Sequence, residues 1–256
     1  MEVNDPGPDA PRLTRGRLRR RLSHLIGILR DHRDLRALVV GLLLVDALFI
    51  GLYAVTRASR ALGVDPGPLG DVPLRITTDG GYPELFSYVK TLLVVVLAGR
   101  LAVSTRQPIH AALAAVYGMI LLDDAFTLHE DGGEALVGAW GLRPVAGLRA
   151  QDLGELVVWA LLGTAAAILL AWGIRRSHGV QLELGALHVL PLAALVLFGV
   201  GADALYGFAK DAFTGAGLLL DCVDDGGEMV AITAACALAL ATTRSHAAGG
   251  SGRPPD

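Results

Sequence analysis

The chain has 256 residues, of which 53% are hydrophobic and only 18% are charged, and its formal net charge is −3. A soluble domain of this length carries more charge and fewer apolar side chains, so the composition excludes an ordinary soluble fold. It predicts a membrane protein.

The first 36 residues form a basic segment in which nine arginines alternate with leucine and isoleucine. This pattern suits an amphipathic helix on an anionic lipid surface, and the alternative is a positive cluster that only sets topology. We expect three parts: a basic cytoplasmic segment (residues 1–36), a transmembrane domain (37–243) and a disordered cytoplasmic tail (244–256).

Six apolar runs are long enough to cross a membrane, because about 20 helical residues cover the roughly 30 Å of hydrocarbon. The expected spans are residues 37–55, 85–103, 109–128, 156–174, 187–208 and a sixth that ends near Thr243. The apolar part of the sixth run, residues 229–243, is too short by itself, so this helix must extend backward through Glu228. These runs predict an all-α, polytopic membrane helical bundle.

The distribution of charge predicts the orientation of the spans. One side, with the two termini and the loops at 100–106 and 175–183, collects 15 of the 22 Lys and Arg residues and 7 of the 25 acids. The other side holds 6 basic and 14 acidic residues. The positive-inside rule therefore predicts a multi-pass protein of the cell (inner) membrane with both termini in the cytoplasm.

A short motif repeats along the spans and suggests three tandem two-helix units. Each unit has an Asp-Ala-(Leu/Phe) motif in one apolar run and a Glu at the head of the next: Asp46 and Glu84, Asp124 and Glu155, Asp203 and Glu228. Carboxylates inside apolar segments cost several kcal/mol unless they are paired, ligating or hydrated. We therefore expect these six side chains to form one polar cluster in the outer half of the bundle.

Helix capping is an alternative explanation for the glutamates. The capping-box spacing Asp-x-x-Glu occurs at Asp131 and Glu134, at Asp152 and Glu155, and at Asp225 and Glu228. One helical face would carry four acids: Asp221, Asp224, Asp225 and Glu228. Capping explains one or two of these like charges, and a cation lying against the stripe would explain all four.

The third span ends in Asp123-Asp124-x4-His129-Glu130, which contains the only histidine expected on the outer side. His129 is a candidate cation ligand or proton carrier, and the alternative is a hydrogen-bonded structural residue. Joint ligation by Asp124 and His129 needs a helix end or a π-bulge between them. The motif is similar to an Asp-Glu-x4-His-Glu pattern of bacterial multi-pass membrane proteins without an assigned function, with Asp124 at the position of Glu. The resemblance implies a similar topology and no particular activity.

These patterns together predict a cation site. Its expected ligands are Asp124, His129, Asp224 and Glu228, with Asp203, Glu155, Asp46 and Glu84 around them. Carboxylates favour hard ions such as Ca²⁺ or Mn²⁺, and one imidazole moves the preference toward Mn²⁺, Fe²⁺ or Zn²⁺. The chain has no Glu-x-x-His motif of a di-iron bundle, no nucleophile elbow, no nucleotide or flavin signal, and no nucleic-acid motif beyond the arginine cluster.

Lys90 is the only lysine inside an expected span, and we expect it to pair with Asp46 on the preceding helix. The pair either stabilises the fold or acts as a switch in which a cation competes with Lys90. Cys222 and Cys236 lie on one helix and are expected to be free thiols.

Three functions fit these expectations. The first is a cation-binding sensor or transporter, the second a metal-dependent membrane enzyme at the outer leaflet, and the third a scaffold or assembly subunit whose acids meet a basic partner. The cytoplasmic halves of the expected spans are nearly pure Leu, Val and Ala, which favours a binding site reached from outside over a continuous pathway. The oligomeric state stays open.

Overall fold

The computed structural model describes residues 13–145, 148–202, 205, 209 and 215–250. Within these residues the fold is helical, apart from an isolated β-bridge between Val145 and Leu148. The α-helices are α1 (Arg15–Asp31), α2 (Arg33–Ala61), α3 (Tyr82–Thr105), α4 (Pro108–Ala125), α5 (Leu128–Trp140), α6 (Ala150–Arg176), α7 (Gly179–Ala186), α8 (Val189–Leu195) and α10 (Ala216–Gly250). Short helical turns lie at η1 (Gly67–Gly70), η2 (Val72–Leu74) and the π-helical η3 (Val196–Ala202). The predicted all-α class is confirmed.

Six helical segments of the described chain are long and apolar enough to cross a membrane. They are α2, α3, α4, α6, the segment Gly179–Ala202 that contains α7, α8 and η3, and most of α10. The last segment extends back past Glu228, as predicted. The fifth begins at Gly179 and not at residue 187, because a turn at Leu187 and His188 joins α7 to α8 without ending the segment.

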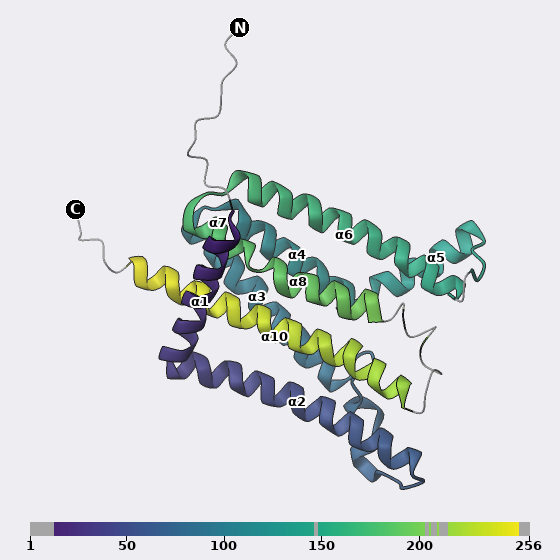
Figure 1. Cartoon of the computed structure of the whole chain (residues 1–256). Coiled ribbons are helices and arrows are strands. Elements are labelled where there is room, and N and C mark those ends of the chain that lie inside the picture. Colours follow the sequence, from purple (N-terminus) through teal and green to yellow (C-terminus); the bar gives the residue numbers. More distant parts are fainter. Residues whose placement is uncertain (1–12, 146–147, 203–204, 206–208, 210–214, 251–256) are drawn as a thin grey trace.

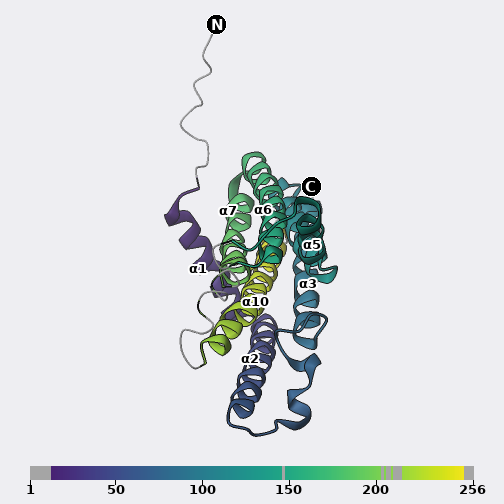
Figure 2. The same ribbon diagram turned by 90° about the vertical axis from the view of Figure 1, so that its right-hand side faces the viewer.

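Helix α10 is the centre of the bundle and packs against α1, α2, α3, α8 and η3. Figures 1 and 2 show it between α2 and α6. Of its apolar stretch 61% is buried, compared with 11% for α2 and 6% for α6. Small side chains such as Ala235, Cys236 and Ala239 let the neighbouring helices approach closely. Helices α2 and α6 are left with the exposed apolar sides that suit contact with lipid.

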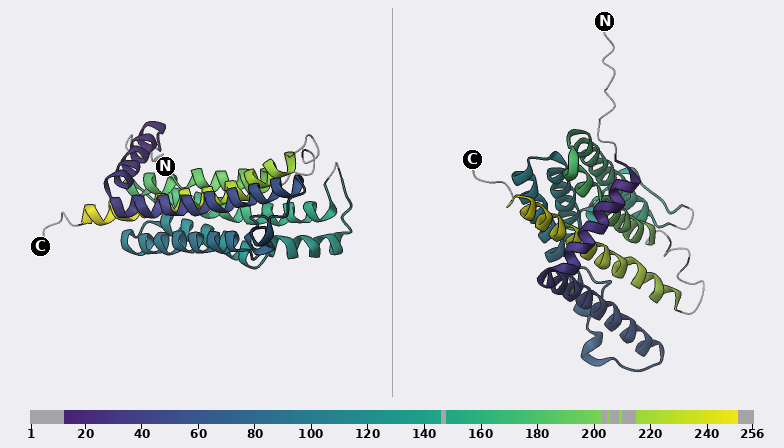
Figure 3. Two further views of the ribbon diagram at one scale, coloured as in Figure 1. Left: turned by 90° about the horizontal axis from the view of Figure 1, so that it is seen from below. Right: turned by 60° about the vertical axis from the view of Figure 1, so that its left-hand side comes forward.

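The long helices lie along one axis, and α1 crosses one end of the bundle (Figures 1 and 3). We call this the α1 end, and it also carries the last turns of α10. Helix α5 and the connection between α2 and α3 lie at the opposite end.

Helix α1 is amphipathic, as predicted, but its apolar side packs on the protein. Leu25 is buried in a cluster with Leu184 of α7 and Ala241 of α10. Arg21 also forms an ion pair with Glu183, with 2.7 Å between Nε and Oε2. This side of α1 is buried because α7 and α10 present an apolar surface to it. The contact of the helix with anionic lipid stays a prediction.

A buried ion pair joins three helices in the middle of the bundle. Lys90 of α3 places Nζ 2.6 Å from Oδ1 of Asp46 on α2, and both side chains are 1% exposed. Thr233 of α10 donates its hydroxyl to the other Asp46 oxygen at 2.6 Å, and Lys90 also donates to the Met229 carbonyl at 2.8 Å. The predicted pairing of Lys90 with Asp46 is confirmed.

The interior toward the α1 end is more polar than expected. It contains the buried side chains of His110, Tyr117, Ser177, Glu183, His188 and Thr242. The prediction of a nearly pure Leu, Val and Ala interior is wrong there. The earlier start of the fifth span is one reason, because it brings Glu183 into the bundle.

The C-terminal helix is longer than the sequence suggested. Residues 244–250, assigned to a disordered tail, continue α10 to Gly250. Residues 1–12 and 251–256 lie outside the described part of the chain. Both cysteines are free, as expected, with Cys236 buried.

Removal of one partner of the buried ion pair should strongly destabilise the protein. We expect Asp46→Ala to lower the free energy of unfolding by about 3–5 kcal/mol, because Lys90 would be left as an unpaired buried charge. The double variant Asp46→Leu/Lys90→Met should recover most of this loss, since it removes both charges. Unfolding in SDS-containing mixed micelles measures these changes.

The control is Arg17→Gln, which breaks a contact of 3.7 Å with Glu183 from an arginine that is 48% exposed. Its effect should stay below about 1 kcal/mol. An equally mild effect of Asp46→Ala would contradict the structural importance of the buried pair.

Candidate functional site

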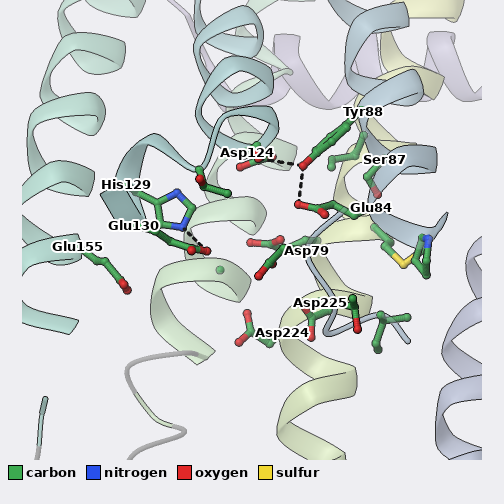
Figure 4. Close-up of a pocket in the computed structure, with 18 of the residues that line it drawn as sticks. Asp79, Glu84, Ser87, Tyr88, Asp124, His129, Glu130, Glu155, Asp224 and Asp225 are labelled. Carbon is green, nitrogen blue, oxygen red and sulfur yellow. Dashed lines mark hydrogen bonds and ion pairs between the residues drawn. The ribbon is translucent and has the colours of Figure 1, made fainter. Parts of the chain in front are cut away.

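The end of the bundle opposite α1 contains a cavity of about 510 Å³. Its lining comes from α3, α4, α5, α6, η3 and α10, together with the chain just before α3 (Figure 4). Eight carboxylates line it: Asp79, Glu84, Asp124, Glu130, Glu155, Asp224, Asp225 and Glu228. Among the described lining residues, the basic side chains are His129 and Arg149. We call this the acidic cavity.

Six of the eight sequence-predicted ligands line the acidic cavity: Asp124, His129, Asp224, Glu228, Glu155 and Glu84. Asp46 is absent from the lining and is instead bonded to Lys90 and Thr233. The reason is depth, because Asp46 lies in the middle of its span. Asp203 falls outside the described residues.

Glu84 is held at the first turn of α3 by short contacts on both carboxylate oxygens. Oε2 accepts a hydrogen bond from the Gly80 backbone N–H. Oε1 lies 2.6 Å from the Tyr88 hydroxyl, which is also 2.9 Å from the Asp124 carbonyl oxygen (Figure 4). Tyr88 therefore connects the start of α3 to the end of α4.

The end of helix α4 sets the position of His129. The helix stops at Ala125, Thr127 has a left-handed backbone with φ of 47°, and α5 starts at Leu128. Joint ligation by Asp124 and His129 required a helix end between them, and this break provides it. It turns His129 back toward Asp123, with 3.1 Å between Nδ1 and Oδ2.

The contacts of His129 leave one ring nitrogen for the cavity. Asp123 is buried, and its Oδ1 has no hydrogen-bond partner. The His129 ring lies 5.0 Å from the Trp159 ring, and its Nε2 is 3.9 Å from Glu130 Oε1 (Figure 4). A carboxylate on Nδ1 favours a proton there and leaves Nε2 as the free base or ligand.

The pKa values around His129 follow from its neighbours. Burial lowers the pKa of His129, but the hydrogen bond and negative charge of Asp123 outweigh it and raise the pKa above its ordinary value. Burial also raises the pKa of Glu130, and the negative charge of Asp79 adds to this. The cavity thus favours protonated forms of both groups.

A close helix contact positions Glu130 and Glu155. A Cβ on Gly154 of α6 would lie 2.4 Å from the Gly133 carbonyl oxygen of α5, so the contact requires glycine. Gln151 then bridges the two helices through Nε2, which lies 2.9 Å from the Glu130 carbonyl and 2.8 Å from Glu155 Oε1.

The acidic stripe of α10 divides between two environments. Asp224, Asp225 and Glu228 line the cavity. Asp221 instead accepts a hydrogen bond of 2.6 Å from the Tyr53 hydroxyl of α2. Glu228 lies against η3, where a Cβ on Gly199 would be 2.0 Å from its Oε1.

Capping does not explain the glutamates as the sequence suggested. Helix α10 begins at Ala216, so Asp225 and Glu228 lie inside it. Helix α5 begins after Thr127, so Asp131 is not its cap. Asp152 does take part in a capping box, but as the third helical residue that accepts the Arg149 N–H at 2.8 Å.

Sequence reasoning missed several lining residues of the cavity. Glu130 and Asp79 were seen only as neighbours of other motifs, and Arg149 and Tyr88 were not considered. The spacing from Glu84 to Tyr88, four residues on one helix, was a usable signal for a shared face. The sequence contains no comparable signal for Arg149. This residue precedes α6 in a loop, and only the tertiary fold brings the loop to the cavity.

The carboxylates surround the cavity without converging into a compact ligand set. Within the described part of the chain, no group of three or more His, Cys, Asp or Glu side chains is arranged to hold a metal ion.

Comparison with known proteins places this architecture in a family. The model of a family described as a domain of unknown function (DUF8692) matches residues 35–242. The chain belongs to this family. The matched range covers nearly all of the bundle and every lining residue of the acidic cavity, while α1 lies outside it. No curated protein and no solved structure matches the chain.

Replacement of Asp123 should lower the pKa of His129. In Asp123→Asn only the charges of Glu130 and Asp124 still oppose the effect of burial, so the pKa of His129 should fall. In the native protein, protonated His129 contributes stability below its unfolded pKa, and this contribution is lost as pH rises through the raised value. An NMR titration of histidine-labelled protein measures the shift.

Asp131→Asn is the control, because this exposed acid lies on the same helix as His129 and is absent from the cavity lining. It should leave the His129 titration nearly unchanged. A pKa of His129 that did not respond to Asp123→Asn would show that the Asp123 contact does not control the ring.

Proposed function

We propose that the protein binds a cation in the acidic cavity, as a sensor or transporter in the cell (inner) membrane. The observation that carries the proposal is electrostatic. Eight carboxylates line one cavity, His129 and Arg149 are the basic side chains among the described lining residues, and Arg149 is already paired with Asp152. The carboxylates of such a site repel one another unless a bound cation or protons reduce their negative charge.

The cation is either a divalent metal or a proton. Hydrated Ca²⁺ or Mn²⁺ fits a wide carboxylate-lined cavity, and His129 Nε2 could add a ligand for Mn²⁺, Fe²⁺ or Zn²⁺. Protons need no convergence of ligands, so the spread of the carboxylates around about 510 Å³ favours them.

We further propose that the cavity faces the outside and that both termini are cytoplasmic. The basic helix α1 and the arginines Arg100, Arg106, Arg175 and Arg176 lie toward the α1 end, as the positive-inside rule requires of a cytoplasmic side. The exposed arginines of α1, such as Arg19 and Arg20, would then lie near anionic lipid headgroups, while Arg21 is engaged by Glu183.

The three tandem two-helix units remain part of the proposal. Glu84, Glu155 and Glu228 come from the three proposed second helices, and all line the acidic cavity. Of the two described aspartates of the units, Asp124 lines the cavity and Asp46 is bonded to Lys90. Asp203 lies outside the described residues.

A second candidate function is a metal-dependent membrane enzyme at the outer leaflet. The contact between Asp123 and His129 favours it, because a carboxylate that orients an imidazole leaves Nε2 as a possible general base. Stabilisation of the purified protein by a metal would be its first requirement.

The proposed orientation can be tested with single cysteines in a variant without Cys222 and Cys236. A cysteine at exposed Trp140, at the end of α5, should react with a membrane-impermeant maleimide in intact cells. A cysteine at exposed Arg19 of α1 should react only after lysis. The reverse pattern would invert the topology.

Cation binding should be visible as a thermal shift of the detergent-solubilised protein. A ligand at a hundredfold excess over its Kd stabilises by about 2.7 kcal/mol. If protons are the ligand, acidification should raise the Tm. If a divalent metal is the ligand, Mn²⁺, Zn²⁺ or Ca²⁺ should raise it at neutral pH. Glu228→Gln should weaken either response, because it removes one cavity charge.

The matched control is Glu134→Gln, which makes the same chemical change at an exposed residue absent from the cavity lining. Its response should equal that of the native protein. Stabilisation by acid without any metal response would select protons. No response to either would refute cation binding.

A further inference from the structure

Beyond the acidic cavity, a row of buried groups continues through the bundle toward the α1 end. Its members are Lys90, Asp46, Thr233, Cys236, Tyr117, His188 and His110, and none is more than 3% exposed. Polar groups in a membrane interior are costly, and they commonly line paths for ions or protons. These residues come from five of the membrane-spanning segments, so the fold brings them together.

The row begins directly below the cavity. Met229 lines the cavity, and its backbone carbonyl accepts a hydrogen bond of 2.8 Å from Lys90 Nζ. Ser87, one helical turn before Lys90, also lines the cavity. The Lys90 ammonium and its partner Asp46 therefore lie next to the cavity lining, although Asp46 is not among the proposed cation ligands.

The next members connect Lys90 to the centre of the bundle. Cys236 lies one turn after Thr233 on α10, and its thiol is 3.2 Å from the Lys90 carbonyl oxygen. Tyr117 of α4 belongs to the same buried cluster as Cys236. The row thus crosses from α3 and α10 to α4.

The last members reach the α1 end. The Tyr117 hydroxyl is 3.5 Å from His188 Nδ1, and the two rings meet edge to face. His110 lies about two helical turns before Tyr117 on the same face of α4. Its Nε2 is 2.9 Å from Gln181 Oε1.

We propose that the protein conducts protons between the acidic cavity and the α1 end along this row. Each transfer breaks one N–H, O–H or S–H bond and forms one on the next group, and no redox change occurs. Tyr117 passes its hydroxyl proton to His188 Nδ1 and takes one from the cavity side, and His188 releases a proton from Nε2 toward His110. Imidazoles suit this role, because one ring nitrogen accepts while the other donates.

This inference deepens the proposed function by naming the transported species, and it rests on the cavity as the source of protons. It also reverses the argument against a continuous pathway, which depended on a purely apolar interior toward the α1 end. That interior contains two buried histidines and a buried tyrosine, His110, His188 and Tyr117.

The test is proton uptake by liposomes that contain the purified full-length protein and an entrapped pH dye, driven by a potassium diffusion potential. The native protein should conduct above protein-free liposomes. Tyr117→Phe, which removes one oxygen, should lower the rate about tenfold or more, because a proton relay loses a required donor. His110→Gln should do the same through a change at the other end of the row.

The matched control is Tyr53→Phe. Tyr53 is also buried and hydrogen-bonded, to Asp221, but it lies outside the row. This variant should conduct like the native protein. Thermal melts of each variant in detergent, with and without acid, show whether the fold and the cavity response survive.

The outcomes separate the two proposals. A lack of conduction by the native protein, with an intact cavity response in detergent, would overturn the relay and leave cation binding standing. Conduction that survives in folded Tyr117→Phe and His110→Gln would also overturn it. Conduction lost in both but kept in Tyr53→Phe would support it, and if Tyr117→Phe does not fold, His110→Gln decides.

Discussion

The buried ion pair between Lys90 and Asp46 is the interaction on which the arrangement of the bundle depends. It joins α2 and α3 through a contact of 2.6 Å, and Thr233 adds α10 through the second Asp46 oxygen. In a membrane interior neither charge has water as an alternative partner, so the three helices must keep the register that brings these groups together. The same relative position of the three helices determines the shape of the cavity above the ion pair.

The acidic cavity shows the opposite electrostatic situation. Below it, one lysine and one carboxylate neutralise each other, while around it carboxylates outnumber the basic side chains of the described lining. Several of these acids are held by rigid features: Glu84 by a backbone N–H, Glu155 by Gln151, and Glu228 by the close backbone of Gly199. The fold therefore holds several carboxylates close together, and their mutual repulsion costs free energy unless their charge is reduced.

The cavity and the row of buried groups form one polar axis inside an apolar shell. Helices α2 and α6 expose most of their apolar stretches, whereas the axis runs beside α10, the most buried of the spans. This division of polar and apolar surface is the one expected of a protein that handles ions within a bilayer. Helix α1 crosses the α1 end of the bundle and packs Leu25 onto α7 and α10.

The sequence by itself determined the number of spans, the class of fold, and most of the carboxylates that gather at one end. It could do so because hydrophobic run length and the placement of Asp and Glu in apolar segments are local properties. It also identified Lys90 and Asp46 as partners, because a lone lysine in a membrane span requires a nearby acid.

The tertiary structure decided the rest, because those contacts join residues far apart in the chain. It set Asp46 below the cavity, turned Asp221 toward Tyr53, and packed Leu25 of α1 against α7 and α10. It also brought His188 to Tyr117 of α4, which no spacing in the sequence connects. Local sequence patterns predict which polar side chains need a partner. For these contacts, the packing of the helices determines which residue that partner is.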